Sequence, residues 1–237
     1  MAKRSAIITG AAQRIGRSLA IGLAKRGFDI GLHYHHSEQD ALRTKAEIEK
    51  LGRACFIMQC DLQDKIKTAQ LVQLAAEKLS NIELLVNNAS TFKQADLLQT
   101  DISLFENNFA IHVLSPFILT IEFAKVCQRG NIINIIDSAI CKTDTAYFAY
   151  RLSKNTLYDL TKLSAKSLAP NIRVNAIAPG STMQPIDLPD NDYLETRAKQ
   201  VPLQIPGSPN IFCKELIIFL LIHLLLENVY LSMAEHT

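Results

Sequence analysis

The chain has 237 residues, of which 48% are hydrophobic and 20% charged, a composition that suits one α/β domain with a large core. The net charge is only +2 and no long basic run occurs, which excludes the electrostatic signature of a nucleic-acid-binding protein. The apolar run Leu216–Leu226 has 11 residues, whereas a membrane helix needs roughly 20, and the apolar stretch before the first turn is too short for the core of a secretory signal. Five scattered cysteines without a C-x-x-C pair predict a reducing compartment, so we expect a cytoplasmic protein without a metal site.

Short apolar segments alternate with longer helical patterns along the chain. The predicted strands are 6–9, 29–34, 54–60, 82–86, 131–136 and 172–177, and the predicted helices lie near 14–26, 38–51, 64–80, 103–128 and 148–168. Several strands are apolar at consecutive positions, which is expected where helices cover both faces of a sheet. The alternation predicts a Rossmann-like, doubly wound parallel sheet in a three-layer α/β/α domain spanning residues 1–237.

The turn after the first predicted strand has the sequence TGAAQRIG over residues 9–16. Gly10 permits a sharp turn, Gly16 lets the following helix approach the sheet, and the helix N-terminus presents N–H groups to a dinucleotide diphosphate. Arg14 stands where the common fingerprint carries another glycine. Its guanidinium could contact phosphate or an anionic or carbonyl-bearing substrate, or it could be an ordinary surface residue.

The second predicted strand indicates which dinucleotide is bound. An NAD site usually has an acid about 20 residues beyond the turn, but this strand ends in Tyr34, His35, His36 and Ser37. Two imidazoles, a hydroxyl and backbone N–H groups could surround a 2′-phosphate, which predicts NADPH; the alternative is that both histidines are ordinary loop residues. Asp61, after the third strand, could accept from the adenine amino group or cap the next helix.

Tyr150 and Lys154 lie one helical turn apart, on one face of a predicted helix. Tyr150 could act as a proton donor, with the Lys154 charge lowering the pKa of the phenol and the ammonium holding the nicotinamide ribose. This pair alone is common in helices. Together with the upstream glycine turn, it predicts a nicotinamide-dependent reductase.

These motifs, with Asn87-Asn88-Ala89 and Pro179-Gly180, resemble those of the short-chain dehydrogenase/reductases over nearly the whole chain. Finer details resemble the pteridine-reductase branch, which includes bacterial dihydromonapterin reductases: residues 11–14 (AAQR), 33–37 (HYHHS), 88–92 (NASTF) and 199–203 (KQVPL). The cofactor-binding residues implied are Gly10, Arg14, Ile15, Gly16, Tyr34, His35, His36, Ser37, Asp61, Leu62, Asn88, Ala89, Ser90, Lys154, Pro179, Gly180 and Ser181. The substrate-binding residues implied are Arg14, Ser90, Phe92, Tyr147 and Tyr150, with Phe92 stacking on a flat pterin ring.

Two departures from the general family pattern bear on the chemistry. Asp137 and Ser138 stand 13 and 12 positions before Tyr150, where most members have a serine. The pteridine-reductase branch has an aspartate here, and a carboxylic acid that feeds protons through Tyr150 suits reduction of a C=N bond, so we predict Asp137, Tyr150 and Lys154 as the catalytic residues with Ser138 as the alternative to Asp137. His112 replaces the usual water-holding Asn, either as a proton relay or as a structural residue.

The C-terminal third contains a weakly patterned segment and an unusual end. Residues 179–210 are either an active-site lid over the substrate or a surface excursion. Relatives usually continue from a Tyr-Leu or Tyr-Ile into a T-G-x…V-D-G-G segment, whereas Tyr230-Leu231 is followed by only six residues. We therefore expect the last edge strand to be missing, which puts the usual tetramer in doubt, although a homodimer or homotetramer is still expected.

The leading hypothesis is an NADPH-dependent short-chain reductase of a pteridine such as dihydromonapterin, dihydrobiopterin or dihydrofolate. One alternative is a 3-oxoacyl or other carbonyl reductase that uses Ser138. Another is a non-catalytic relative that binds NADPH as a sensor or partner subunit. We expect a small-molecule substrate and no nucleic-acid or membrane partner.

Overall fold

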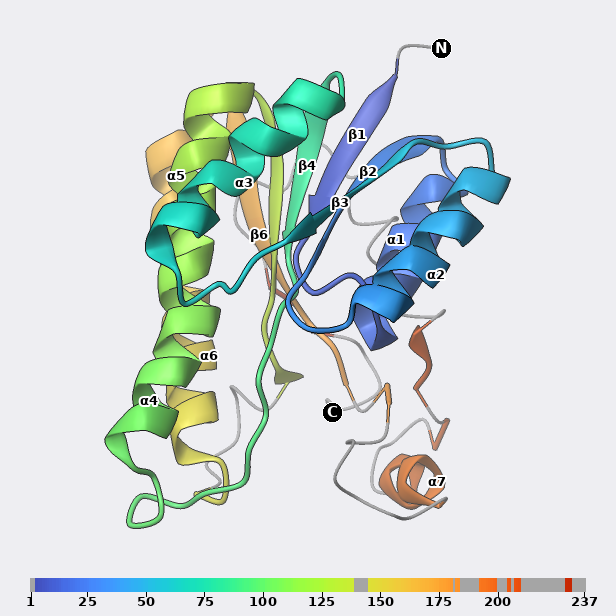
Figure 1. Cartoon of the computed structure of the whole chain (residues 1–237). Coiled ribbons are helices and arrows are strands. Elements are labelled where there is room, and N and C mark those ends of the chain that lie inside the picture. The colour runs from blue at the N-terminus through green and yellow to red at the C-terminus, as the bar shows by residue number, and fades with distance from the viewer. Residues whose placement is uncertain are drawn as a thin grey trace.

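The computed structural model describes residues 3–138, 145–180, 182–183, 192–199, 204–205, 207–209 and 229–231. In this part of the chain, parallel strands form one sheet in the order β3-β2-β1-β4-β5-β6-β7. The strands are β1 (Arg4–Ile8), β2 (Phe28–Tyr34), β3 (Cys55–Gln59), β4 (Ile82–Asn87), β5 (Gly130–Ile135), β6 (Ile172–Ala178) and β7 (Val229–Leu231). Helices lie on both sides of the sheet (Figure 1), which confirms the predicted doubly wound, three-layer architecture.

The helices bury two separate cores against the two faces of the sheet. Helices α1 (Arg14–Ala24) and α2 (Glu38–Lys50) cover one face, and α3 (Lys65–Lys78), α5 (Ser115–Cys127) and α6 (Phe148–Leu168) cover the other (Figure 1). Adjacent residues of β1 show the division, because Ile8 belongs to the first core and Ile7 to the second. This is why the strand is apolar at consecutive positions.

A continuous helical run of 26 residues, Ile102–Cys127, crosses the second face. It consists of α4 (Ile102–Phe109), the π-helical turn η1 (Ala110–Leu114) and α5. By length and composition alone the run could cross a membrane, but it contains the buried polar residues Asn108, His112 and Ser115 and packs against α3, α6 and β4. It is therefore a helix of the protein core. The sequence predicted one regular helix here, so the π-helical turn differs from the prediction. Such turns within helices often occur at functional sites.

The edge of the sheet beside β6 corrects one expectation. The last strand was expected to be missing because no V-D-G-G segment follows Tyr230, yet β7 pairs in parallel with residues 176–178 of β6. Val229 and Tyr230 have high strand propensity, and the three residues Val229–Leu231 suffice to pair the carboxyl-terminal half of β6. Helix α7 (Tyr193–Ala198) precedes it. Within the predicted loop 179–210, residues 181, 184–191, 200–203, 206 and 210 lie outside the described residues, as does the whole apolar run Leu216–Leu226.

The strand order places the site. The chain moves from β1 to β2 on one side and later returns to β4 on the other side of β1, so the topological switch point lies between β1 and β4. In open parallel sheets, ligands bind outside the carboxyl ends of the strands at such a point. Gly10 follows β1, Asn88 follows β4 and Asp137 follows β5, so the topology gathers all three at this edge.

Candidate active site

The glycine turn between β1 and α1 has the geometry that the sequence predicted. Gly10 has a φ of +62°, and a Cβ added to it would lie 2.9 Å from the Cα of Ala89. A Cβ on Gly16 would lie 2.1 Å from the carbonyl oxygen of Gly10, so only glycine allows α1 to start this close to the sheet. Gln13, at the N-cap of α1, makes no side-chain capping hydrogen bond. The N-terminus of α1 therefore fits an anion such as a dinucleotide diphosphate.

Three residues fasten this turn to the end of β4. The Thr9 hydroxyl oxygen accepts hydrogen bonds from the backbone N–H groups of Asn88, at 2.9 Å, and Ala89, at 3.0 Å. The Asn88 side-chain amide donates to the Thr9 carbonyl at 2.9 Å. Asn88 and Ala89, predicted as cofactor-binding residues, thus shape the dinucleotide turn. The sequence did not predict that Thr9 holds the turn against β4. Its position directly before Gly10 in the motif could have indicated this role.

Arg14 is held in a left-handed backbone conformation, with a φ of 52°. A residue with a Cβ is disfavoured there by roughly 1–2 kcal/mol, which explains why glycine is common at this position of the turn. Such strain outside glycine is concentrated at functional sites. Ile15, the next residue, packs partly buried against the first core, so its side chain supports the turn from below.

His33 is a site residue to which the sequence analysis assigned no role. Its Nδ1 accepts a hydrogen bond from the Gly10 N–H at 3.1 Å, so its Nε2 carries the proton and donates to the Cys60 carbonyl at 3.0 Å. Burial lowers the pKa of His33 to about 4, so the ring is neutral at physiological pH. The available signal was a histidine between the apolar residues Leu32 and Tyr34 of a predicted strand, since a buried imidazole requires partners.

The residues predicted to surround the 2′-phosphate lie just beyond β2. His35 and His36 have ring centroids 3.4 Å apart, and Ser37, at the N-cap of α2, makes no side-chain capping hydrogen bond. The Tyr34 ring is instead buried in the first core, so of that residue only the backbone borders the site. Three polar groups with unused binding capacity at a helix N-terminus fit a phosphate.

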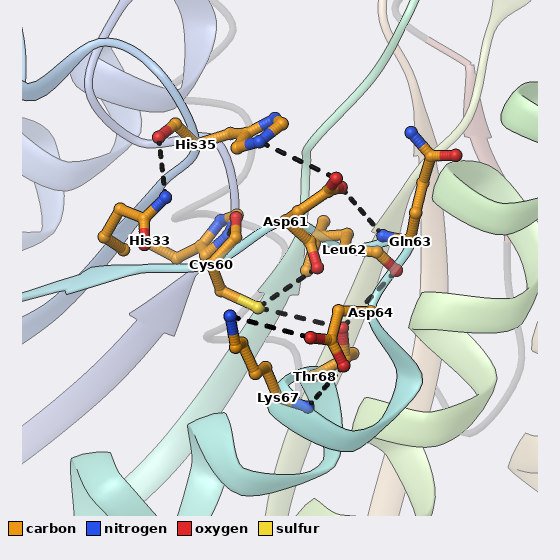
Figure 2. Close-up of polar contacts among 10 residues, drawn as sticks. His33, His35, Cys60, Asp61, Leu62, Gln63, Asp64, Lys67 and Thr68 are labelled. Atoms are coloured by element: carbon orange, nitrogen blue, oxygen red, sulfur yellow. Dashed lines mark hydrogen bonds and ion pairs between the residues drawn. The ribbon is translucent and has the colours of Figure 1, made fainter.

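Asp61 lies just beyond β3, beside His35 (Figure 2). Its carboxylate is 3.7 Å from the Nε2 of His35 and accepts a hydrogen bond from the Gln63 N–H at 2.9 Å. The alternative that Asp61 caps the next helix is wrong, because Asp64 caps α3 by accepting from the N–H groups of Ile66 and Lys67. Leu62 is buried beneath the loop. Asp61 therefore remains available at the adenosine end of the site.

The catalytic candidates meet at the carboxyl end of β5. The Tyr150 hydroxyl donates a hydrogen bond of 2.6 Å to the Asp137 carboxylate, so Asp137 is the neighbour that faces the tyrosine. Ser138 is buried beside it. The Lys154 ammonium donates to the Ile135 carbonyl at 2.7 Å and lies 5.8 Å from the centre of the Tyr150 ring. One phenol, one carboxylate and one ammonium are thus held together at the reacting end.

The electrostatics of this group correct the expectation that Lys154 lowers the pKa of Tyr150. Burial, followed by the Asp137 carboxylate, raises the pKa of Tyr150 well above its ordinary value of 10.0. Burial also lowers the pKa of Lys154 to about 8, against the opposite effect of Asp137. Desolvation dominates because both side chains are enclosed. Tyr150 is therefore a neutral phenol here, which is the form that can donate a proton.

An aromatic wall, formed by Phe92, Tyr147 and Tyr150, borders the catalytic group. Phe92 stacks on Tyr147 with centroids 4.3 Å apart and meets the Tyr150 ring edge-on at 4.7 Å. Backbone hydrogen bonds of 2.9 Å join Ala95 to Ala146 and to Phe148 at the start of α6. Phe92 is 41% exposed, so part of its ring is accessible from solvent. The structure therefore brings the predicted substrate residues Phe92, Tyr147 and Tyr150 together.

His112 lies behind this wall, in η1, and is 1% exposed. Its Nε2 is 3.1 Å from the Thr91 backbone nitrogen and 3.0 Å from the Ser90 hydroxyl. Its Nδ1 is 2.8 Å from the Ser153 hydroxyl. Ser90, predicted to contact cofactor and substrate, is thus also a partner of His112. The role of Ser153 was not predicted, and no local pattern signals it.

The remaining predicted residues are placed less fully. Pro179 and Gly180 follow β6 directly and are partly exposed at the same edge of the sheet. Ser181 lies outside the described residues. Among the residues that are described, no group of three His, Cys, Asp or Glu side chains could hold a metal ion.

Comparisons with known proteins agree with this geometry. Residues 4–192 match the family model described as short chain dehydrogenase. An uncharacterised oxidoreductase from Bacillus subtilis (strain 168) is 35% identical over 211 residues, which cover 86% of this chain and 72% of the relative. Pteridine reductase 1 from Leishmania tarentolae is 29% identical over 258 residues, covering 91% of this chain and 89% of the relative.

A solved structure is similar over almost the whole chain. FolM alternative dihydrofolate reductase 1 from Brucella canis, complexed with NADP, superposes with a TM-score of 0.87 at 31% identity, covering 98% of this chain and 92% of that one. These matches confirm the predicted resemblance to the pteridine-reductase branch. The family-model match covers most of the chain, including the glycine turn and the Tyr150–Lys154 pair. The chain therefore belongs to the short-chain dehydrogenase family and is an oxidoreductase.

Proposed function

We propose that this chain is an NADPH-dependent reductase of a pteridine, of the dihydromonapterin, dihydrobiopterin or dihydrofolate class. The hydrogen bond from Tyr150 to Asp137 carries the proposal. Reduction of a C=N bond requires a proton on nitrogen, and a carboxyl group behind the phenol can resupply that proton. Reduction of a ketone is better served by a neutral hydroxyl against the developing alkoxide. The pteridine reductase and dihydrofolate reductase among the similar proteins support the same substrate class.

Each residue has a defined task in the proposed reaction. Bound NADPH would supply the hydride. Tyr150 would donate the proton to the substrate nitrogen, and the Asp137 carboxylate, 2.6 Å away, would take up a proton from solvent and return it to the phenolate oxygen. Lys154 would hold the nicotinamide ribose with its ammonium group, and Phe92 would stack on the pterin ring. Arg14 would orient the polar edge of the ring from the glycine turn.

NADPH rather than NADH is supported by the groups at the end of β2. His35, His36 and Ser37 lie where an acidic residue would contact a ribose 2′-hydroxyl in an NAD enzyme. The Brucella canis structure was solved with NADP. Calorimetric titration should give a dissociation constant for NADPH at least tenfold below that for NADH. Equal affinities would contradict this part of the proposal.

The substrate class is tested by NADPH oxidation with a dihydropteridine and, in parallel, with a β-ketoacyl thioester. We expect turnover of the pteridine. Asp137→Ala should lower kcat by about a hundredfold, whereas Ser138→Ala, a change at the adjacent buried position, should keep kcat within about twofold. Turnover of the thioester alone, with activity dependent on Ser138, would replace the proposal with a carbonyl reductase.

We also propose that copies of the chain associate into a homodimer or homotetramer. Large apolar side chains are exposed on α5 and α6, among them Phe117, Ile121 and Leu163. These two helices are in contact with each other on the same face of the sheet. Light scattering during size-exclusion chromatography measures the assembly, and Leu163→Lys should shift it toward the monomer.

A further inference from the structure

The hydrogen bonds of His112 fix which nitrogen carries the proton. A backbone N–H can only donate, so the Nε2 that receives the Thr91 N–H must present a lone pair. The proton is then on Nδ1 and is donated to the Ser153 hydroxyl oxygen. The Ser153 hydroxyl in turn donates to the Tyr150 carbonyl at 2.7 Å. Burial, followed by the Lys154 charge, lowers the pKa of His112 well below its ordinary value, so the ring stays neutral.

This chain of hydrogen bonds ends at a group that cannot pass a proton onward. The last acceptor is the backbone carbonyl of Tyr150, whereas the proton that matters is on the Tyr150 phenol, which is bonded to Asp137. Both ring nitrogens of His112 are engaged by protein groups. The alternative that His112 relays protons to the catalytic group is therefore not supported by this geometry.

The same bonds do join two walls of the site. On one side, Ser90 and Thr91 lead directly to Phe92, which contacts Tyr147 and Tyr150. On the other side, Ser153 lies on the turn of α6 that carries Tyr150. The His112 ring also meets the Tyr150 ring edge-on, with centroids 5.4 Å apart. A rigid five-membered ring thus sets the spacing between the stacking wall and the proton donor.

We propose that His112 is a positioning residue that sets the distance between the Phe92 wall and the Tyr150 hydroxyl. The inference rests on the proposed function, because it assigns the wall to substrate binding and Tyr150 to proton transfer. The Nε2 side of the ring governs how the substrate is held, and the Nδ1 side governs where the proton donor stands. Loss of the hydrogen bond at Nε2 should therefore affect KM, and loss of the hydrogen bond at Nδ1 should affect kcat.

Two amide variants separate the two sides of the ring. In His112→Asn, the amide nitrogen reaches the place of Nδ1 and keeps the donor for Ser153, while the Thr91 N–H loses its acceptor. In His112→Gln, the amide oxygen reaches the place of Nε2 and keeps that acceptor, while Ser153 loses its donor. For the dihydropteridine, the Asn variant should raise KM about tenfold with kcat within about twofold, and the Gln variant should lower kcat about tenfold with KM within about twofold.

Ser153→Ala provides a second test of the Nδ1 side without changing the histidine. It should lower kcat as the Gln variant does, and the kcat–pH profiles of all three variants should keep the wild-type shape. Equal changes of kcat and KM in the Asn and Gln variants, or loss of a limb of the profile in both, would overturn the proposal. Loss of a limb of the kcat–pH profile would indicate that His112 relays protons.

The tautomer can be measured without substrate or cofactor. In protein labelled with ¹⁵N-histidine, long-range ¹⁵N–¹H correlation spectra should show His112 protonated at Nδ1 and His33 protonated at Nε2. A proton on Nε2 of His112 would refute the inference. Absence of pteridine turnover by the wild-type enzyme would instead refute the proposed substrate. In that case the same kcat and KM comparison applies to the carbonyl substrate that is turned over.

Discussion

Two buried histidines hold the two halves of this site, and they do so in opposite tautomers. At the nucleotide end, His33 accepts from Gly10 through Nδ1 and donates to Cys60 through Nε2. At the catalytic end, His112 accepts from Thr91 through Nε2 and donates to Ser153 through Nδ1. The His33 ring joins two loop residues, whereas the His112 ring joins a loop to helix α6. The local partners alone, a backbone N–H in both cases, decide the position of the proton.

The two histidines differ in the groups that they connect, so replacing His33 and replacing His112 should have different consequences. His33, on β2, joins backbone groups that follow the two strands on either side of it, Gly10 after β1 and Cys60 after β3, so its loss should appear mainly as lost stability. His112 acts through the hydroxyl groups of Ser90 and Ser153, beside the proton donor. Its loss should appear mainly in the kinetics. A buried histidine is therefore informative about function only once the groups it connects are known.

The catalytic half is tested most severely by Tyr150→Phe. Loss of the phenol removes the proton donor, and we expect kcat for the dihydropteridine to fall about a thousandfold. The dissociation constant for NADPH should change less than threefold, since the glycine turn is untouched. The measurements are steady-state kinetics and calorimetry, with Tyr158→Phe, on the same helix, as the matched control. Retention of wild-type turnover would remove Tyr150 from the mechanism.

The nucleotide half is tested by acid. The folded-state pKa of His33, about 4, lies below the ordinary value of 6.5, so the unfolded state binds the proton more readily. The contribution of neutral His33 to stability is therefore complete above pH 6.5 and is lost as the pH falls through 4. The free energy of unfolding should fall by about 3 kcal/mol over this range. Urea unfolding should show this loss, with a shallower dependence in His33→Gln, whose amide retains a donor and an acceptor. Parallel profiles for the two proteins would contradict the assignment to His33.

Much of the fold and part of the site follow from local sequence. Consecutive apolar residues in β1 and β4 predicted strands with both faces covered, and Gly10 and Gly16 predicted the tight turn, because those signals depend on neighbouring residues only. Asp137 was preferred to Ser138 by resemblance to the pteridine-reductase branch and by its chemistry. The structure places it against Tyr150.

Features that depend on distant contacts could not be predicted in the same way. His33 connects Gly10 to Cys60 only because β2 lies between β1 and β3, and Ser153 matters only because η1 packs against α6. The pKa of Tyr150 was expected to fall, since a lysine one turn away is visible in the sequence whereas the enclosure that raises it is not. The short strand β7 was missed because the expectation rested on a downstream motif.

The charge on Lys154 gives a test that involves both halves, because its ammonium is expected to hold the cofactor next to Tyr150. Since burial lowers its pKa to about 8, the ammonium loses its proton as the pH rises through that value. The kcat/KM for NADPH should fall about tenfold per pH unit above 8. Lys154→Arg keeps the charge at high pH, so any residual activity of this variant should lack that limb. A wild-type profile that is flat to pH 10 would contradict the assignment.

The smallest effect is expected at Arg14, which lies in the glycine turn to which His33 is hydrogen-bonded through Gly10. Its φ of 52° disfavours a side chain, so Arg14→Gly should raise the free energy of unfolding by about 1 kcal/mol. The same variant should raise KM for the dihydropteridine, because the guanidinium is lost. Arg14→Asn, which tolerates this conformation, should show the kinetic loss with a smaller gain in stability. Lower stability in both variants would mean that the Arg14 side chain supports the fold, and the backbone strain would then lose its link to substrate binding.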